Sequence, residues 1–273
     1  MLTPRHRRKY DAFEHLCQSL FSSKADLFIM LTAYFDDSGS SADNQVAVVA
    51  GYIATTHMWQ LFNQRWSSLL DRYQVTYLRR SDLENFQGQF KDWNPPRRTE
   101  FIKKAHAIIR RCTYSGFGLA LIKSDFDELI GEYAMLKRLG IFAWCAQGCM
   151  AGVSLWADKK HRDKLIQYVF EAGTTGSPEF EKVMQIMYRD DVDRKRYHIG
   201  GWSFQGKDVM PLQAADTAAY EFYKFVRNEK IEGNKRPIRL SARDLFRQHE
   251  IQFFRQFDKN TFESFVKNWN GTI

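Results

Sequence analysis

The sequence predicts an α/β domain, because segments with strand character alternate with helical segments along most of the chain. The strand-like segments are rich in β-branched and aromatic residues and end in turn residues or carboxylates. Amphipathic segments with apolar residues three and four apart follow several of them. This alternation argues against an all-α bundle, and the chain shows no internal repeat. The predicted strands cover residues 31–36, 45–54, 114–122, 165–170 and 198–204.

The helices are predicted from their apolar periodicity and from the residues at their ends. Thr55 or Thr56 can cap a helix that continues with a core-facing stripe to about Tyr73. Two consecutive prolines break the chain before the next helix, and Pro211 opens the last strongly periodic one. The remaining predicted helices contain residues 101–109, 125–157, 179–188 and 212–225.

The length of 273 residues suffices for one large domain, or for one domain that carries an insertion. Residues 1–29 are expected to form a basic, partly helical extension, and Met30, directly before the first strand, is a candidate start of the protein. Residues 30–273 are expected to form a single domain with a helical insertion at about 125–160. The content of 44% apolar and 26% charged residues excludes a disordered chain.

The charge and the cysteines indicate a partner and a compartment. The chain has 40 Lys and Arg residues against 32 Asp and Glu, a net charge of +8 that favours a polyanionic partner such as nucleic acid. Four cysteines without a Cys-x-x-Cys pair form neither a disulfide framework nor a zinc knuckle, and Cys145 and Cys149 are expected to be buried. No secretory signal follows the basic stretch at 5–9, so we expect a cytoplasmic protein.

Two features are better explained by the core than by a ligand or a membrane. Residues 139–157 carry no charge and could span a bilayer, but their glycines and polar residues favour a buried core helix, and no membrane partner is expected. Trp59, Phe62 and Trp66 follow helical spacing, which favours packing over base stacking. No phosphate-binding loop or dinucleotide-binding glycine motif is present, so neither ATP nor NAD is indicated.

Acidic residues gather at three places that we expect to face one another. Asp36 and Asp37 end the first strand, Glu171 follows a later strand, and Asp216 lies in the last periodic helix. An Asp before Ser-Gly often only forms a turn, but Asp216 stands among small and apolar neighbours and needs a metal, a cation or hydrogen bonds. Hydrolysis of a phosphodiester needs an activated water and a neutralised leaving oxygen, which Mg²⁺ or Mn²⁺ on carboxylates can supply.

Two of these segments also carry a family resemblance. Residues 34–39 (Tyr-Phe-Asp-Asp-Ser-Gly) and 211–216 (Pro-Leu-Gln-Ala-Ala-Asp) resemble domain-of-unknown-function family 3800, as do residues 51–53 and 81–84 between them. The resemblance extends from about Met30 to about Arg255. It implies a divergent ribonuclease H-like fold, with a central mixed sheet flanked by helices and an acidic metal site.

The resemblance assigns roles to individual acids. Asp36 corresponds to the acid of the first strand and Asp216 to the acid of the late helix, and Glu171 is the candidate for the middle strand. These three are the predicted catalytic residues, and together with Asp37 they are the predicted metal ligands. Asp37 stands where Glu is usual, and Asp82 lacks the His that often precedes it in similar sequences. The outer candidates that would support the ligands are Asp82, Glu84, Gln213 and Glu221.

Two further interpretations of the outer residues stay open at this stage. Gln213 lies three residues before Asp216 and could orient its carboxylate, or it could be exposed without a role. Residues 224–259 contain ten basic and five acidic residues and could follow a phosphate backbone, or form a solvated mixed-charge surface. The predicted nucleic-acid contacts are Arg239, Arg243 and Arg247.

The leading expectation is a nuclease that cleaves RNA or DNA with Mg²⁺ or Mn²⁺ bound by the acids. One alternative is a noncatalytic nucleic-acid-binding or protein-interaction module on the same fold. A phosphatase for small phosphoesters would use the same acids, but it would place them in a closed pocket. The sequence leaves the oligomeric state open.

Overall fold

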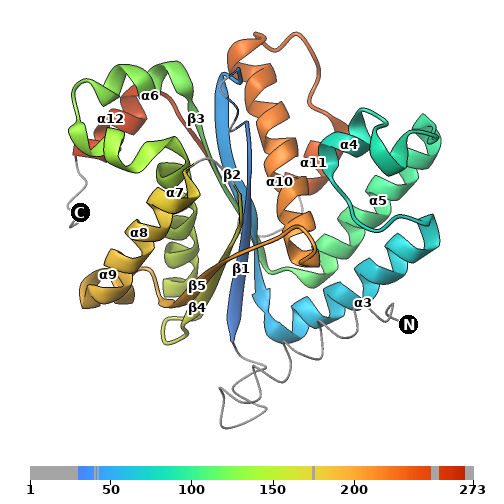
Figure 1. Ribbon diagram of the computed structural model, residues 1–273, viewed down its shortest axis with the longest axis horizontal. Helices are drawn as coiled ribbons and strands as arrows, with labels where there is room; N and C mark the ends of the chain where they lie inside the picture. Colours follow the sequence, from blue (N-terminus) through green and yellow to red (C-terminus); the bar gives the residue numbers. More distant parts are fainter. Residues whose placement is uncertain (1–29, 40, 42, 174–175, 247–251, 268–273) are drawn as a thin grey trace.

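A six-stranded mixed sheet separates two layers of helices (Figure 1). The computed structural model describes residues 30–39, 41, 43–173, 176–246 and 252–267, so the predicted N-terminal extension lies outside the described residues. The α/β class is confirmed. The strands are β1 (Leu31–Ser38), β2 (Val46–Thr55), β3 (Ser115–Ile122), β4 (Ile166–Glu171), β5 (Ile199–Gln205) and β6 (Gln252–Phe257).

The strand order is β5-β4-β1-β2-β3-β6. β1 is antiparallel to β2, and β2 is antiparallel to β3. β4 runs parallel to β1, β5 runs parallel to β4, and β6 runs parallel to β3. Because β1, β4 and β5 share one direction, their carboxyl ends meet at the same edge of the sheet.

One face of the sheet is covered by a helical layer in which α7 is central. α7 packs on β2 and β3, so the segment predicted as an insertion forms a layer of the domain itself. Its most apolar window is long enough to cross a membrane, but 78% of it is buried in the domain. Cys145 and Cys149 are buried there as predicted. The helices of this layer are α6 (Lys123–Ile130), α7 (Ala134–Lys160), α8 (Ser177–Arg189), α9 (Asp191–Arg196) and α12 (Lys259–Lys267).

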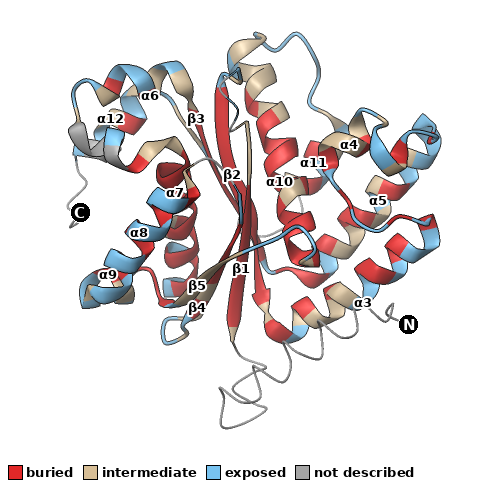
Figure 2. Ribbon diagram, viewed as in Figure 1, coloured by how far each residue is buried: buried red, intermediate tan, exposed pale blue. Residues whose placement is uncertain are grey.

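The opposite face is covered by α10, which lies directly on β1 and β2 and is buried along most of its length (Figure 2). Pro211 stands in the first turn of α10, where the missing N–H leaves no bond unmade. The layer contains α3 (Thr56–Tyr73), α4 (Arg80–Glu84), α5 (Pro95–Cys112), α10 (Met210–Val226) and α11 (Leu240–Phe246), with short turns η1 (Gly88–Phe90) and η2 (Arg227–Ile231).

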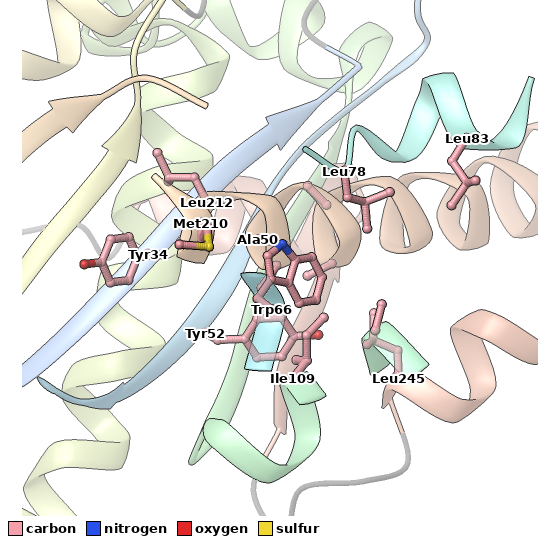
Figure 3. Packing of buried hydrophobic residues seen from close by; sticks show 14 of the residues in the cluster. Tyr34, Ala50, Tyr52, Trp66, Leu78, Leu83, Ile109, Met210, Leu212 and Leu245 are labelled. Carbon is pink, nitrogen blue, oxygen red and sulfur yellow. The ribbon is translucent and has the colours of Figure 1, made fainter. Parts of the chain in front are cut away.

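The predicted aromatic core is confirmed on this face. Trp59, Phe62 and Trp66 of α3 are each at most 3% exposed, and the rings of Phe62 and Trp66 stack at 4.8 Å. Figure 3 shows Trp66 in one cluster with Leu78, from the segment before α4, and Leu212 of α10. These rings are therefore unavailable for stacking on bases.

The C-terminal elements α11, β6 and α12 were absent from the sequence-based prediction. β6 extends the sheet beside β3 and places Phe254 on the α10 face and Phe257 on the α7 face. The segment was interpreted through its basic charge alone. Its aromatic residues, which are spaced to reach both faces of a sheet, were the signal for this strand.

Candidate carboxylate site

The register between two parallel strands brings Asp36 and Glu171 together. Phe35 of β1 is the partner of Phe170 of β4, so the next residue of each strand is an acid at the same edge. The rings of Phe35 and Phe170 stack at 5.6 Å on the α7 face. Since side chains alternate along a strand, Asp36 and Glu171 both lie on the α10 face. Asp36 stands within β1, and Glu171 is the last residue of β4.

Asp37 completes a group of three carboxylates. One oxygen each from Asp36, Asp37 and Glu171 lies within 4.8 Å of the others. Asp36 is 3% and Glu171 6% exposed, while Asp37 is partly buried. The backbone N–H of Asp37 donates to Asp36 Oδ1 at 2.7 Å, which fixes the orientation of that carboxylate. Three acids predicted as metal ligands are thus neighbours.

The turn after these acids depends on a glycine. Gly39 has φ +79°, and a Cβ atom there would stand 2.1 Å from the carbonyl oxygen of Val46. No other residue fits this combination of a left-handed backbone and a close approach. The Asp-Asp-Ser-Gly motif therefore combines the acids with the turn that ends β1.

Asp216 approaches the group from α10, which packs on β1. Burial is the main cause that raises the pKa of Asp36 well above its usual value, and the negative charges of Asp216 and then Asp37 raise it further. Burial also raises the pKa of Asp216, although the backbone N–H of Arg80, which donates to Asp216 Oδ2 at 2.6 Å, counteracts this. The structure therefore concentrates like charge at the edge of the sheet.

Lys207 is a residue of this site that the sequence analysis missed. It stands in the loop between β5 and α10, and its Nζ lies 2.9 Å from Glu171 Oε1. Its charge lowers the pKa of both Asp36 and Asp216. The signal was its position directly after β5, whose last residue Gln205 is the sheet partner of Glu171. Its side chain is 43% exposed, so the ammonium sits at the rim.

The donor set fits a hard divalent cation. Two oxygen ligands of one Mg²⁺ or Mn²⁺ ion are at most about 4–5 Å apart when each bond is about 2.0–2.6 Å long. The oxygens of Asp36, Asp37 and Glu171 meet this limit, and carboxylate oxygens are the ligands that such ions prefer. Lys207 forms an ion pair with one of these acids, Glu171.

A second ionic cluster lies behind Asp216 and contains two of the outer candidates, Glu84 and Glu221. The guanidinium of Arg80 is fully buried, and it donates to Glu221 Oε1 at 2.7 Å and to Glu84 Oε2 at 2.9 Å. Glu221 itself is fully buried. Arg80 therefore connects the two clusters, since its backbone binds Asp216 and its side chain binds Glu84 and Glu221.

Arg239, which is predicted to contact phosphate, forms two ion pairs in this second cluster. Its Nη2 lies 2.7 Å from Glu84 Oε2 and its Nε 3.4 Å from Glu221 Oε2, so its charge is compensated inside the protein. Arg243 is exposed on α11 and is still a candidate contact. Arg247 lies outside the described residues.

Gln213 supports the site by a route other than the predicted one. It is buried, and its Oε1 accepts hydrogen bonds from Trp66 Nε1 at 2.8 Å and from the backbone of Leu78 at 2.9 Å. Its Nε2 donates to the carbonyl oxygen of Lys207 at 3.2 Å. Gln213 thus holds the segments that carry Arg80 and Lys207, and Asp216 is oriented by the backbone of Arg80 instead.

Asp82 is not brought into the carboxylate group. It is partly buried in α4, and its Oδ1 accepts a hydrogen bond from the neighbouring Ser81 hydroxyl at 3.5 Å. The acids of the described residues that can share one ion are Asp36, Asp37 and Glu171.

Comparison with known proteins adds no assignment: no family model matches the chain, and neither the curated proteins nor the solved structures gave a match. The resemblance to family 3800 therefore stays a prediction from two motifs. The functional argument rests on the geometry of the acids.

Proposed function

We propose that this protein is a divalent-metal-dependent nuclease that hydrolyses phosphodiester bonds of RNA or DNA on a ribonuclease H-like fold. Asp36, Asp37 and Glu171 would hold Mg²⁺ or Mn²⁺, and Asp216, which lies outside this group of three, would add negative charge beside it. The observation that carries the proposal is the convergence of three carboxylates within 4.8 Å at the ends of two parallel strands. A central mixed sheet flanked by helices agrees with the fold that the resemblance implies.

The protein supplies a rigid and negatively charged frame. When bound, the divalent cation supplies positive charge that activates the attacking water and neutralises the leaving oxygen. Asp36 and Glu171 are fixed by strand pairing, and Asp216 is held by the N–H of Arg80 at 2.6 Å. Rigid carboxylates need no reorganisation as the reaction proceeds, which is the condition for effective electrostatic catalysis.

The cations at the rim suit a phosphate backbone. Lys207 is 43% exposed beside Glu171, and Arg79 is exposed and close enough to lower the pKa of Asp216. Both can contact phosphate oxygens on either side of the scissile bond. The net charge of +8 favours the same class of substrate.

The closed pocket that a small-molecule phosphatase needs is not supported at this place. A cavity of about 740 Å³ lies next to α4, but none of the four acids is in its wall. The acids instead stand at an edge of the sheet next to an exposed lysine. The exposed ammonium of Lys207 at this edge suits a phosphate backbone.

One observation favours the noncatalytic alternative. The ion pair between Lys207 and Glu171 at 2.9 Å shows that the protein can neutralise one acid without a metal. A nucleic-acid-binding module would keep this pair permanently. Metal binding separates the two functions, because the module predicts no stabilisation by Mg²⁺ or Mn²⁺.

The decisive experiment is cleavage of end-labelled single-stranded and duplex RNA and DNA with Mg²⁺, with Mn²⁺ or with EDTA. We expect cleavage with a divalent cation only, and a loss of at least about 100-fold in Asp36→Asn and in Asp216→Asn. Asp163→Asn is the matched control, because Asp163 is exposed and precedes the start of β4, whereas Glu171 stands at the opposite end of that strand. Circular dichroism establishes that each variant is folded. Cleavage that survives in both site variants rejects the proposal.

A further inference from the structure

A cavity of about 740 Å³ lies on the α10 face of the sheet, lined by residues of α5, of the C-terminal end of α10 with η2, and of the segment leading to α11. This volume is in the range of pockets that hold nucleotide-sized ligands. Its wall contains Arg80 and Glu84 but none of the four acids of the carboxylate site. The cavity is therefore a separate place in the fold.

The wall of the cavity carries more positive than negative charge. Seven of its lining residues are lysine or arginine, and three are acidic. Glu84 and Glu232 are already bound by arginines, at 2.7 Å from Arg239 and 3.1 Å from Arg227. These two acids are therefore neutralised by arginines, and the remaining lysines and arginines give the cavity wall a net positive charge.

Lys103 and Lys224 account for much of this surplus, because neither forms an ion pair with any residue that the structure describes. Burial, followed by the neighbouring guanidiniums of Arg227 and Arg239, lowers the pKa of Lys224. Two ammonium groups and several guanidiniums around one cavity repel one another unless an anion lies between them. Such an arrangement favours a ligand with more than one negative charge.

His106 adds an unsatisfied polar group to the same wall. It is 3% exposed, and its Nε2 has no hydrogen-bond partner within the described part of the chain. Burial and then the charge of Arg80 lower the pKa of His106 to about 3, so the ring is neutral at physiological pH. A buried ring nitrogen without a partner is costly, and a polar ligand in the cavity can supply one.

We propose that this cavity binds a phosphate-bearing ligand of nucleotide size, either a free nucleotide or the phosphorylated end of a nucleic-acid strand. Lys103 and Lys224 contact the phosphate oxygens, because both line the cavity and no ion pair within the described residues engages their ammonium groups. The proposal goes beyond the nuclease function and does not depend on it, since the carboxylate site contributes no residue to the wall.

Calorimetric titration with pyrophosphate, AMP and ADP, in EDTA and at near-physiological salt, tests the binding. Salt suppresses loose polyelectrolyte association, so binding that persists reports a built site. We expect the double variant Lys103→Gln/Lys224→Gln to weaken binding at least about ten-fold, the effect of losing one or two charge-assisted hydrogen bonds. Lys195→Gln, an exposed lysine on α9 across the sheet, is the matched control and is expected to bind as the wild type does.

The source of the phosphate is found by competition with oligonucleotides that carry a 5′-phosphate or a 5′-hydroxyl. Binding and displacement by AMP or ADP identify a free nucleotide, and preference for the 5′-phosphate alone identifies a strand end. The proposal is overturned if no phosphate compound binds up to about 1 mM, or if the double variant, shown to be folded, binds as tightly as Lys195→Gln. The same titration on Asp36→Asn keeps this result separate from any failure of the nuclease proposal.

Discussion

Two clusters of acids lie on either side of Arg80, and they are compensated in opposite ways. Glu84 and Glu221 are held by the guanidiniums of Arg80 and Arg239. Burial raises the pKa of Glu84, but these arginines lower it to about 2. The pKa of Asp36 is instead raised by its burial and by neighbouring acids. The protein supplies its own cations to one cluster and leaves the other short of positive charge.

This difference is already present within one helix. Asp216 and Glu221 belong to the same helix, and Asp216 is the more exposed of the two. The fully buried Glu221 receives an arginine, while Asp216 receives a backbone N–H and shares one exposed lysine with its neighbours. An acid cluster that needs an external cation is expected at a metal site, and a compensated one is expected in a structural core.

The largest expected effect comes from breaking the compensated cluster. Arg80→Met removes one of the ion-pair partners of Glu84. It also leaves the buried Glu221 with the longer contact to Arg239, at 3.4 Å. Removing one member of a buried ion pair costs about 3–5 kcal/mol, so we expect the free energy of unfolding, measured with urea, to fall by about that amount.

The control for this variant removes the stranded charge as well. Arg80→Met/Glu221→Gln is expected to recover part of the loss, because no unpaired carboxylate then remains in the core. If Arg80→Met has the same urea midpoint of unfolding as the wild type, Arg80 does not stabilise the cluster of Glu84 and Glu221. The proposed difference between the two clusters is then wrong.

The next effect is the stabilisation of the uncompensated cluster by metal. A ligand that binds only the folded state at about 100 times its dissociation constant adds about 2.7 kcal/mol to the free energy of unfolding. We therefore expect Mn²⁺ and Mg²⁺ to raise the urea midpoint of the wild type and EDTA to reverse the change. Asp36→Asn is expected to lose this response and Asp163→Asn to keep it. A wild type that responds to neither ion would favour the noncatalytic module.

The elements next to strong sequence signals were predicted, and those that depend on tertiary pairing were not. The sequence indicates Asp36, Glu171 and Asp216 as site residues, because an acid at a strand end or among small residues departs from the local pattern. β6 was missed because a short edge strand in a basic segment is stabilised by its pairing with β3, which the local sequence does not encode.

The ion-pair partners of Arg239 and Lys207 could not be predicted from the local sequence either. Arg239 was predicted to contact phosphate from its spacing with other arginines, but the fold places Glu84 and Glu221 beside it. Glu84 is 155 residues away in the chain, so no local pattern contains this contact. Lys207 was overlooked for the same reason, since its role depends on β5 lying next to β4.

A smaller effect is the pH dependence of stability, which differs in sign between the clusters. A carboxyl group with a raised pKa in the folded state, such as Asp36, makes the protein less stable as pH rises from its unfolded pKa through its folded pKa. Glu84 acts oppositely: it stabilises the fold above its ordinary pKa of 4.5, and this is lost as pH falls toward about 2.

Asp36→Asn separates these two contributions. Without metal we expect the variant to be more stable than the wild type at neutral pH by about 1 kcal/mol, a size typical for relieving strain at a functional site. Its stability should also fall less than that of the wild type as pH rises above the ordinary aspartate pKa of 3.8, measured in urea titrations. Equal pH profiles for the two proteins would show that Asp36 carries no electrostatic strain.

The smallest effect on stability is expected at Lys207, and it sharpens the contrast most directly. Its ion pair with Glu171 is 43% exposed on the lysine side, so Lys207→Met should change the free energy of unfolding by less than about 1 kcal/mol. The ammonium and a divalent cation compete for Glu171, however, and its removal should tighten Mn²⁺ binding about five-fold in calorimetric titrations. Lys207→Arg, which keeps the charge, should bind Mn²⁺ as the wild type does. Weaker binding in Lys207→Met would make the lysine a support of the metal site. Tighter Mn²⁺ binding would show that a metal ion can take the place of the Lys207 ammonium beside Glu171. The buried guanidinium of Arg80, in contrast, is a permanent partner of Glu221.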